Sequence, residues 1–297
     1  MKLDVVAFYR FVALDDLPSL RDRLLSLCRE HGLRGTILIA SEGVNGTVAG
    51  PDAATAVLIE TLDEICGVRL GEVKHSRAQA WPFARMKVRI RPEIITMRAS
   101  EADPTRQVGT YVAPKDWNAL VADPDVLLID TRNRYETKVG TFEGARDPGI
   151  DSFTEFKAYV ERELDPAENP KVAMFCTGGI RCEKASSYML AKGFEEVYHL
   201  KGGILQYLEE IDADTSRWQG ECYVFDDRVA VGHGLAPGSW TACFACGEPL
   251  SEADLASTDF EPGVSCPRCV GDLTEDKARD LRARHAQLTS LDRRRVG

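Results

Sequence analysis

The stretch 172–185 constrains the fold more than any other part of the sequence. An apolar run over residues 172–175 is typical of a buried strand, and it ends at Cys176. Two glycines and Arg181 follow, before a helical pattern begins. A strand, a tight glycine loop and a helix N-terminus together direct backbone N–H groups into the loop. We expect these amides and Arg181 to favour the thiolate of Cys176 and make it reactive.

The residues between and beyond these two side chains complete the candidate loop. They are Thr177, Gly178, Gly179, Ile180 and Cys182. The alternative is a structural thiol in the core, since free cysteine is often a small buried residue. The six residues from Cys176 to Arg181 resemble the active-site loop of rhodanese sulfurtransferases. Tyrosine phosphatases place the arginine one residue later, at the position of Cys182 here, which argues against phosphatase chemistry.

Composition limits the class of protein. The chain has 297 residues and a formal net charge of −10, so it has the length for two or three domains and no general affinity for nucleic acid. No apolar run of about 18 residues predicts a membrane span. An acidic residue, Asp4, follows the start at once, so we expect no secretory signal. Nine cysteines that include a reactive one favour the reducing cytoplasm over a disulfide framework.

Residues 1–98 predict a first domain of the ferredoxin-like type. Strand patterns at 3–12, 34–40, 47–50 and 87–90 alternate with helical patterns that begin near Leu17 and Ala53. The resulting order β-α-β-β-α-β is that of a ferredoxin-like α+β sandwich. Residues 99–111, which include Asp103-Pro104, are expected to be a linker.

The segment 69–98 is basic although the chain as a whole is acidic. Within it basic and apolar residues alternate strictly from position 85 to 91, so a strand would place all the basic side chains on one face, roughly 7 Å apart. That spacing suits a phosphodiester backbone. The candidate RNA-binding residues of the segment are Lys74, Arg77, Arg85, Lys87, Arg89 and Arg91. The alternative is a charged strand face that only contacts solvent.

Residues 112–218 predict a parallel α/β domain, because strand and helix patterns alternate there. Active sites in such sheets lie beyond the carboxyl ends of the strands. Asp130 and Arg132 follow one predicted strand, and Cys176 follows another, so we expect the three to converge. Asp130 and Arg132 are therefore candidate catalytic residues, with Arg132 facing the pocket. A simple turn-forming role is the alternative for Asp130.

Residues 219–297 form a cysteine-rich extension with a basic, helical tail. Two Cys-x-x-Cys pairs are separated by 19 intervening residues, a spacing within the range of four-thiolate zinc sites. The predicted ligands of a structural zinc ion are Cys243, Cys246, Cys266 and Cys269. Reduced thiols or a redox pair are the alternative. The tail residues Arg279, Arg282, Arg284 and Arg293–Arg295 offer a second candidate RNA contact.

Four stretches together resemble the bacterial rhodanese-domain family of tRNA uridine hydroxylases. They are the sequences at positions 41–47, 85–88, 176–185 and 266–269. The resemblance implies oxygen-dependent hydroxylation of C5 of the wobble uridine of tRNA to 5-hydroxyuridine, with tRNA as partner and O2 as co-substrate. We find no flavin or nicotinamide signature. Two other classes stay open: a sulfurtransferase that carries a persulfide on Cys176, and a non-catalytic RNA-binding module.

Overall fold

The computed structural model describes residues 2–296, with side chains described through Leu288. The chain divides into two compact units. The first comprises Met1–Cys222 and Gly232–Ala236, and the second comprises Tyr223–Val231 and Pro237–Gly297. Among residues 2–296 no helix combines the length and the apolar character needed to cross a bilayer.

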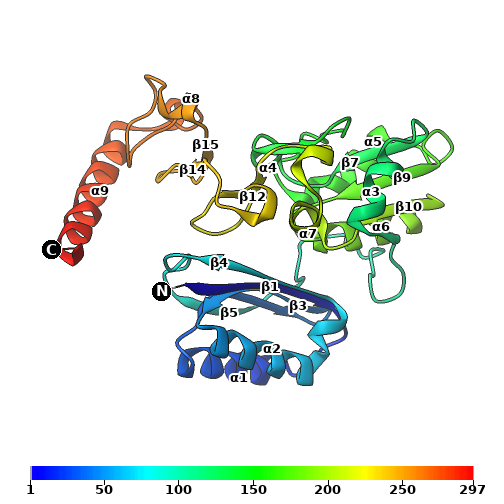
Figure 1. Ribbon diagram of the computed structural model, residues 1–297, viewed down its shortest axis with the longest axis horizontal. Helices are drawn as coiled ribbons and strands as arrows, with labels where there is room; N and C mark the ends of the chain where they lie inside the picture. Colours follow the sequence, from blue (N-terminus) through cyan, green and yellow to red (C-terminus); the bar gives the residue numbers. More distant parts are fainter. Residues whose placement is uncertain (1, 297) are drawn as a thin grey trace. The chain divides into compact units, whose positions relative to one another are not determined.

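The first unit begins with a five-stranded sheet covered by two helices (Figure 1). Its elements are β1 (Leu3–Phe11), α1 (Leu17–Glu30), β2 (Arg34–Ala40), β3 (Gly43–Gly50), α2 (Asp52–Cys66), β4 (Glu72–Ala78) and β5 (Met86–Ile90). The sheet order β4-β1-β3-β2-β5 confirms the ferredoxin-like fold and adds a fifth strand. The strand expected at 87–90 is this added strand, paired in parallel with β2. The fourth strand, β4, was missed because its sequence lacks an apolar alternation.

The two faces of this ferredoxin-like sheet have different surroundings. Val6, Phe8 and Ile37 point to the side of α1 and α2 and form the domain core with them. We call the opposite side the open face, since neither helix lies on it (Figure 1). Strand pairing aligns one row of residues across the open face, because paired residues project to the same side. The row runs through Glu72, Tyr9, Asn45, Leu38 and Arg89.

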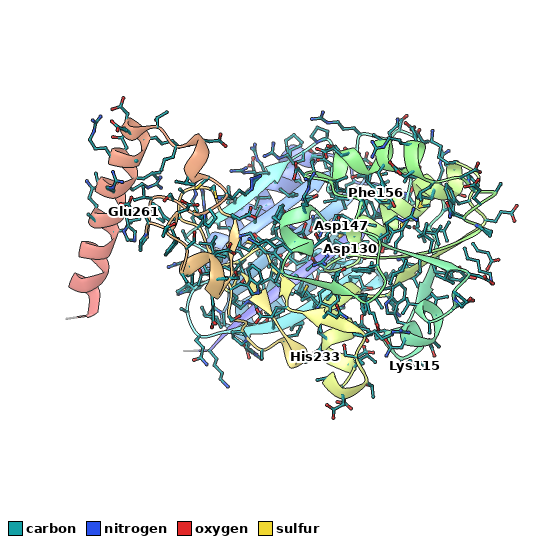
Figure 2. The ribbon with its side chains drawn as sticks, turned by 90° about the horizontal axis from the view of Figure 1, so that it is seen from above. Lys115, Asp130, Asp147, Phe156, His233 and Glu261 are labelled. Atoms are coloured by element: carbon teal, nitrogen blue, oxygen red, sulfur yellow. The ribbon has the colours of Figure 1, made fainter. Side chains whose placement is uncertain are left out.

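A parallel α/β domain follows in the same unit. Its elements are β6 (Thr110–Val112), α3 (Pro114–Val121), β7 (Val126–Asp130), α4 (Arg134–Thr137), β8 (Gly140–Phe142), α5 (Phe156–Glu163), β9 (Lys171–Phe175), α6 (Ile180–Ala191), β10 (Glu196–Leu200), α7 (Gly203–Glu210) and β11 (Trp218–Gly220). The main sheet has the order β6-β10-β9-β7, and all its pairs are parallel, as the sequence predicts. Met174, Phe156 and Tyr188 lie in its core. Figure 2 labels Phe156 and Asp130 in this domain.

The second unit is small and holds the paired cysteine motifs. Its elements include β14 (Thr241–Ala242), β15 (Pro249–Leu250), α8 (Glu252–Leu255) and α9 (Glu275–Val296). A short hairpin, β12 (Cys222–Tyr223) with β13 (Ala230–Val231), leads into it. Its core consists of Leu250 and cysteine side chains.

The predicted basic tail forms helix α9, but two of its cations, Arg279 and Arg282, are paired with acids. Arg282 contacts Glu261, which Figure 2 labels, and Arg279 contacts Asp276. The side chains of Arg293–Arg295 lie outside the described residues.

Candidate active site and cysteine cluster

The cysteine loop joins β9 to α6 at the carboxyl end of the parallel sheet. Gly179 caps α6 with a φ of 101°, a conformation that favours glycine. Its N–H donates a hydrogen bond to Cys176 Sγ at 3.1 Å. Cys176 is fully buried, at 0% relative exposure. The loop therefore presents backbone donors to a sulfur that is shielded from solvent.

The environment of Cys176 favours the thiolate despite this burial. Burial alone would raise the pKa of Cys176, but hydrogen bonds from Cys182 and Gly179 and the charge of Arg181 lower it to about 6. The pKa of Cys182 is raised well above its usual value by burial and by the neighbouring Cys176. Cys182 thus remains a thiol and donates to the sulfur of Cys176. A thiolate at neutral pH is the nucleophilic form.

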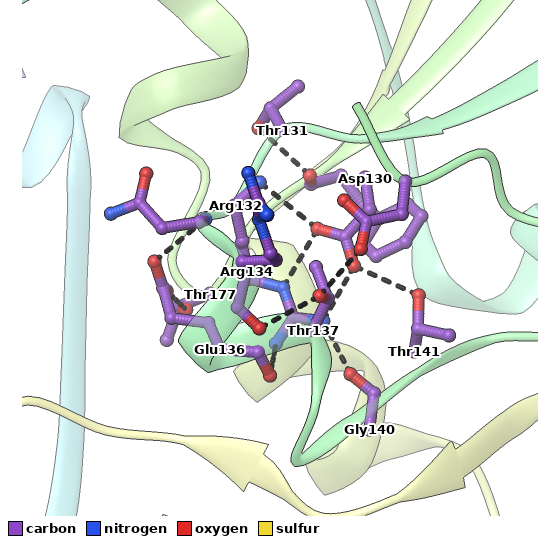
Figure 3. Close-up of polar contacts among 12 residues, drawn as sticks. Asp130, Thr131, Arg132, Arg134, Glu136, Thr137, Gly140, Thr141 and Thr177 are labelled. Carbon is purple, nitrogen blue, oxygen red and sulfur yellow. Dashed lines mark hydrogen bonds and ion pairs between the residues drawn. The ribbon is translucent and has the colours of Figure 1, made fainter. Parts of the chain in front are cut away.

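Arg181 is held by a carboxylate that the sequence did not reveal. Its guanidinium makes two hydrogen bonds to Glu136, at 2.6 and 2.7 Å, and both side chains are buried. Glu136 also accepts a hydrogen bond from Thr177 (Figure 3). Burial would raise the pKa of Glu136, but Arg181 and Arg132 lower it overall, so it stays ionised. The pair fixes Arg181 beside the loop.

The structure corrects the expected position of Arg132. Its guanidinium is fully buried and forms a bidentate pair with Asp130, with the Nη2–Oδ2 distance at 2.6 Å (Figure 3). The remaining donors go to the carbonyl oxygens of Glu136 and Gly140. Arg132 therefore does not face a pocket: a buried guanidinium without partners would be costly, and local acceptors satisfy it. Asp130 and Arg132 brace the turn after β7.

That turn supports the cysteine loop directly. Between the paired residues, Thr131 uses both its backbone N–H and its hydroxyl to donate to the carbonyl of Phe175. The same hydroxyl lies 3.6 Å from Cys182 Sγ. The structure thus brings Asp130, Arg132 and Cys176 to one end of the sheet. Asp130 and Arg132 pair with each other there, whereas it is Arg181 whose charge acts on Cys176.

The six predicted RNA-binding residues do not form one surface. Lys74 and Arg77 belong to β4, whereas Lys87 and Arg89 belong to β5, at the opposite edge of the sheet. Lys74 is mostly buried and bonded to Glu72 and Gln206. Arg77 pairs with Asp52 at the start of α2. These basic residues are close in sequence but lie at opposite edges of the sheet, because the chain crosses the whole sheet between β4 and β5.

Of the six predicted RNA-binding residues, those at β5 can be reached by solvent and therefore by RNA. Arg85, Arg89 and Arg91 are exposed, and Lys87 is half-buried. Met86 and Val88 pack into the core, as the alternation predicts. Ile90 does not, being 39% exposed, because β5 is an edge strand and ends there.

The open face of the ferredoxin-like sheet also contacts the cysteine loop. Tyr9 Oη donates a 2.8 Å hydrogen bond to Glu183 of α6. A Cβ on Gly179 would lie 2.7 Å from the same hydroxyl, so the phenol sits against the loop backbone. The next residue, Lys184, is 1% exposed at its side chain and binds both Glu42 and Glu93. Two consecutive residues of the loop helix thus anchor the first domain.

The four cysteines of the second unit converge. Their sulfur atoms all lie within 4.8 Å of one another, and two of the separations, Cys246–Cys266 and Cys266–Cys269, are 3.7 Å. Sulfurs in a tetrahedral zinc site with Zn–S bonds of about 2.3 Å would stand about 3.8 Å apart. The donor set and its spacing therefore fit a metal ion of this type.

Comparison with known proteins identifies the family. Residues 3–94 match the UPF0176 acylphosphatase like domain, and residues 113–210 match the Rhodanese-like domain. The tRNA uridine(34) hydroxylase of Mesorhizobium japonicum is 52% identical over 96% of this chain and 92% of its own length. The chain belongs to the tRNA uridine(34) hydroxylase family. The Agrobacterium fabrum member is 49% identical over 96% of this chain and 90% of its own length.

Some site residues of this hydroxylase were not assigned roles from sequence alone. Two of them, Tyr9 and Glu136, contact the loop but are far from it in sequence. The third, Glu183, follows the loop directly, and the sequence did not show that its side chain would be buried. Glu42, Glu183 and Lys184 lie within the stretches that carry the family resemblance, which was the available signal. Their pairing needed the fold, since Tyr9 and Glu183 are separated by 174 positions.

Proposed function

We propose that this protein is an enzyme that hydroxylates C5 of uridine 34 in tRNA, giving 5-hydroxyuridine with O2 as co-substrate, in the cytoplasm. The observation that carries the proposal is Cys176, a buried thiol whose pKa is lowered to about 6 inside the rhodanese-like loop. Membership of a family whose curated members are named for this reaction supports it.

The proposed chemistry begins with the thiolate of Cys176. Addition of the sulfur to C6 of uracil would move electron density to C5, the atom that gains oxygen. Gly179 N–H and the Cys182 thiol hold the sulfur as an anion before reaction, and Arg181 supplies positive charge. Because Glu136 fixes Arg181, that charge is already in place when substrate arrives.

We propose that tRNA approaches the thiol across the open face of the ferredoxin-like sheet. The row that begins at Arg89 on β5 leads to Tyr9, which touches the cysteine loop. Phosphates bound along β5 would place the anticodon loop across this face. Cys176 is fully buried, so the base must be unstacked and the side chains that cover the sulfur must move.

A nucleoside analysis tests the function and separates its alternatives. tRNA from cells with and without the gene is digested, and 5-hydroxyuridine is measured by mass spectrometry. Loss of this nucleoside without the gene is the expected result. Loss of a thiolated nucleoside instead would favour a sulfurtransferase, and unchanged tRNA would leave only a binding role.

A charge-matched pair of variants tests the RNA surface. Arg85→Ala with Lys87→Ala should weaken tRNA binding and reduce the salt slope by roughly 0.7 to 0.9 per lost phosphate contact. The control is Arg21→Ala with Arg23→Ala, which removes the same charge from α1, on the covered side of the sheet. Equal salt slopes in the two double variants would contradict the proposed surface.

We further propose that Cys243, Cys246, Cys266 and Cys269 bind a structural zinc ion. Four thiolates leave no ligand position for substrate. When bound, the ion would join the turn after β14 to the turn that carries Cys266 and Cys269. This joint would hold a unit whose apolar core is small.

A further inference from the structure

The carboxyl group of Glu183 is buried close to the reactive sulfur. Glu183 is 8% exposed and lies in the first turn of α6, where its N–H bonds to the carbonyl of Gly179. It accepts hydrogen bonds from two phenols, Tyr9 of β1 and Tyr111 of β6. The charged groups that shift its pKa most, Glu72 and Cys176, are both acidic. A carboxyl buried beside other acidic groups is a candidate functional residue.

A chain of contacts links this carboxyl to the thiol. Glu183 Oε1 accepts from Tyr9 Oη at 2.8 Å, and the phenol lies against Gly179. Gly179 N–H in turn donates to Cys176 Sγ at 3.1 Å. A uracil ring bound at the sulfur would therefore approach the Tyr9 hydroxyl on the loop side.

The environments of Glu183 and Cys176 shift the pKa values of the two groups toward each other. Burial raises the pKa of Glu183, and the charges of Glu72 and Cys176 raise it further, against hydrogen bonds from Tyr111 and Tyr9 that lower it. Cys176 shifts the opposite way. The groups that face Glu183 are Tyr9 on β1, Glu72 on β4, Tyr111 on β6 and Cys176 in the loop. A thiol made more acidic beside a carboxyl made more basic suits a nucleophile next to a proton acceptor.

Hydroxylation at C5 requires such an acceptor. In an adduct with Cys176 on C6, C5 would carry both its original hydrogen and the new hydroxyl. To release the product, a proton acceptor removes the C5 proton. The electron pair of the C5–H bond re-forms the C5–C6 double bond, and the C6–S bond breaks to return the thiolate. This elimination needs no oxidant or reductant, and it requires only a group that accepts the C5 proton.

We propose that Tyr9 and Glu183 are the proton-accepting pair of this step, the Tyr9 hydroxyl passing the C5 proton to the Glu183 carboxylate. The proposal rests on the proposed function. It makes the active site a joint product of both domains, since Tyr9 comes from the ferredoxin-like sheet and Glu183 from the loop helix. It also explains why a tyrosine of the open face reaches into a cysteine loop.

The test is single-turnover hydroxylation of U34-containing tRNA by the full-length protein across pH, followed as 5-hydroxyuridine. Glu183→Gln keeps an acceptor for the Tyr9 hydrogen bond but cannot take a proton, so a purely structural contact would survive it. We expect its rate to fall about 100-fold at unchanged tRNA affinity, the lower range for loss of a general base. Tyr9→Phe should lower the rate as well.

The pH profile supplies a readout that stability does not affect. Both Cys176 and Glu183 must be deprotonated to act, so the wild-type rate should fall on the acid side with a slope of about two on a logarithmic scale. Glu183→Gln should reduce that slope to about one, leaving the ionisation of Cys176. Glu161→Gln is the matched control, because Glu161 accepts a 2.8 Å hydrogen bond from Tyr188 elsewhere in the domain.

The outcomes separate this inference from the function on which it rests. A Glu183→Gln protein with the wild-type rate and acid slope overturns the role of Glu183 while the hydroxylase function stands. Absence of 5-hydroxyuridine with wild-type protein, while Cys176→Ser behaves identically, overturns the proposed function and this inference with it. Should Glu183→Gln fail to fold, Tyr9→Phe decides, and a wild-type rate in that variant overturns the pair.

Discussion

The two cysteine sites of this protein use the same side chain under opposite conditions. Cys176 stands at the end of a parallel strand, and its thiolate is stabilised by two backbone amides, one thiol and a fixed arginine. The four cysteines of the second unit have chiefly each other, with sulfurs within 4.8 Å. A single acidic thiol suits covalent chemistry, and four converging thiols suit a metal ion. The surroundings of a cysteine, rather than the residue itself, decide which role it takes.

The sharpest test of this contrast is a pair of serine variants. Cys176→Ser should abolish 5-hydroxyuridine formation, because a hydroxyl is not ionised at neutral pH, and should leave the metal content unchanged. Nucleoside mass spectrometry and elemental analysis give the two readouts on the same protein. Residual hydroxylation in cells that lack the native gene would show that Cys176 is not the nucleophile.

Cys243→Ser should have the reverse effect. Wild-type protein purified without chelator should contain about one zinc ion per chain, and the variant should lose most of it. The ionisation of Cys176 should be unaffected, since its stabilising groups lie in the other unit. A variant with full zinc content would place the ligands elsewhere.

A smaller effect is expected when the support of Arg181 is removed. Glu136→Gln leaves the buried Arg181 without its carboxylate, which should reduce the free energy of unfolding by about 3 to 5 kcal/mol. Glu143→Gln is the control, because Glu143 pairs with Arg217 at the surface and should cost about 0 to 1 kcal/mol. Urea unfolding of both variants measures the difference. Equal losses would mean that the Glu136 pair does not stabilise the loop.

The smallest effect concerns the ionisation of Cys176. Its pKa of about 6 can be followed as the thiolate absorbance lost in Cys176→Ser. Cys182→Ala removes a hydrogen-bond donor to the thiolate, so the pKa of Cys176 should rise and the absorbance should appear at higher pH. Cys28→Ala removes a buried thiol from α1 and should change nothing. An unmoved midpoint in Cys182→Ala would assign the acidity to the amides and Arg181 alone.

The sequence predicted features that depend on neighbours along the chain. The strand, loop and helix around Cys176 and the parallel sheet follow from local periodicity, and the structure has them. The ferredoxin-like fold was also predicted, but with residues 87–90 in the place that β4 takes as its fourth strand. The sequence could not predict β4, an edge strand with little apolar alternation. Nor could it show that Lys74 and Lys87 lie at opposite edges, because strand order depends on pairing across the sheet.

Buried ionic partners were equally hidden. Arg132 follows a predicted strand end in the sequence, where active-site residues are expected. In the structure its guanidinium instead donates hydrogen bonds to Asp130 and to two carbonyl oxygens. The sequence related Arg181 only to Cys176, but in the structure its guanidinium also forms an ion pair with Glu136. Such pairings are decided by burial, which makes an unpaired charge costly, and burial is a property of the folded chain.

The contact of Lys184 with Glu42 and Glu93 bears on how the chain is made. Ribosomes deliver the ferredoxin-like domain first, so both carboxylates emerge well before the ammonium that joins them. Without the Lys184 ammonium, Glu42 and Glu93 would be two like charges that lack their shared cation. Docking of the loop helix then cancels the repulsion in one step. The catalytic loop can therefore dock on the first domain only after α6 has been made.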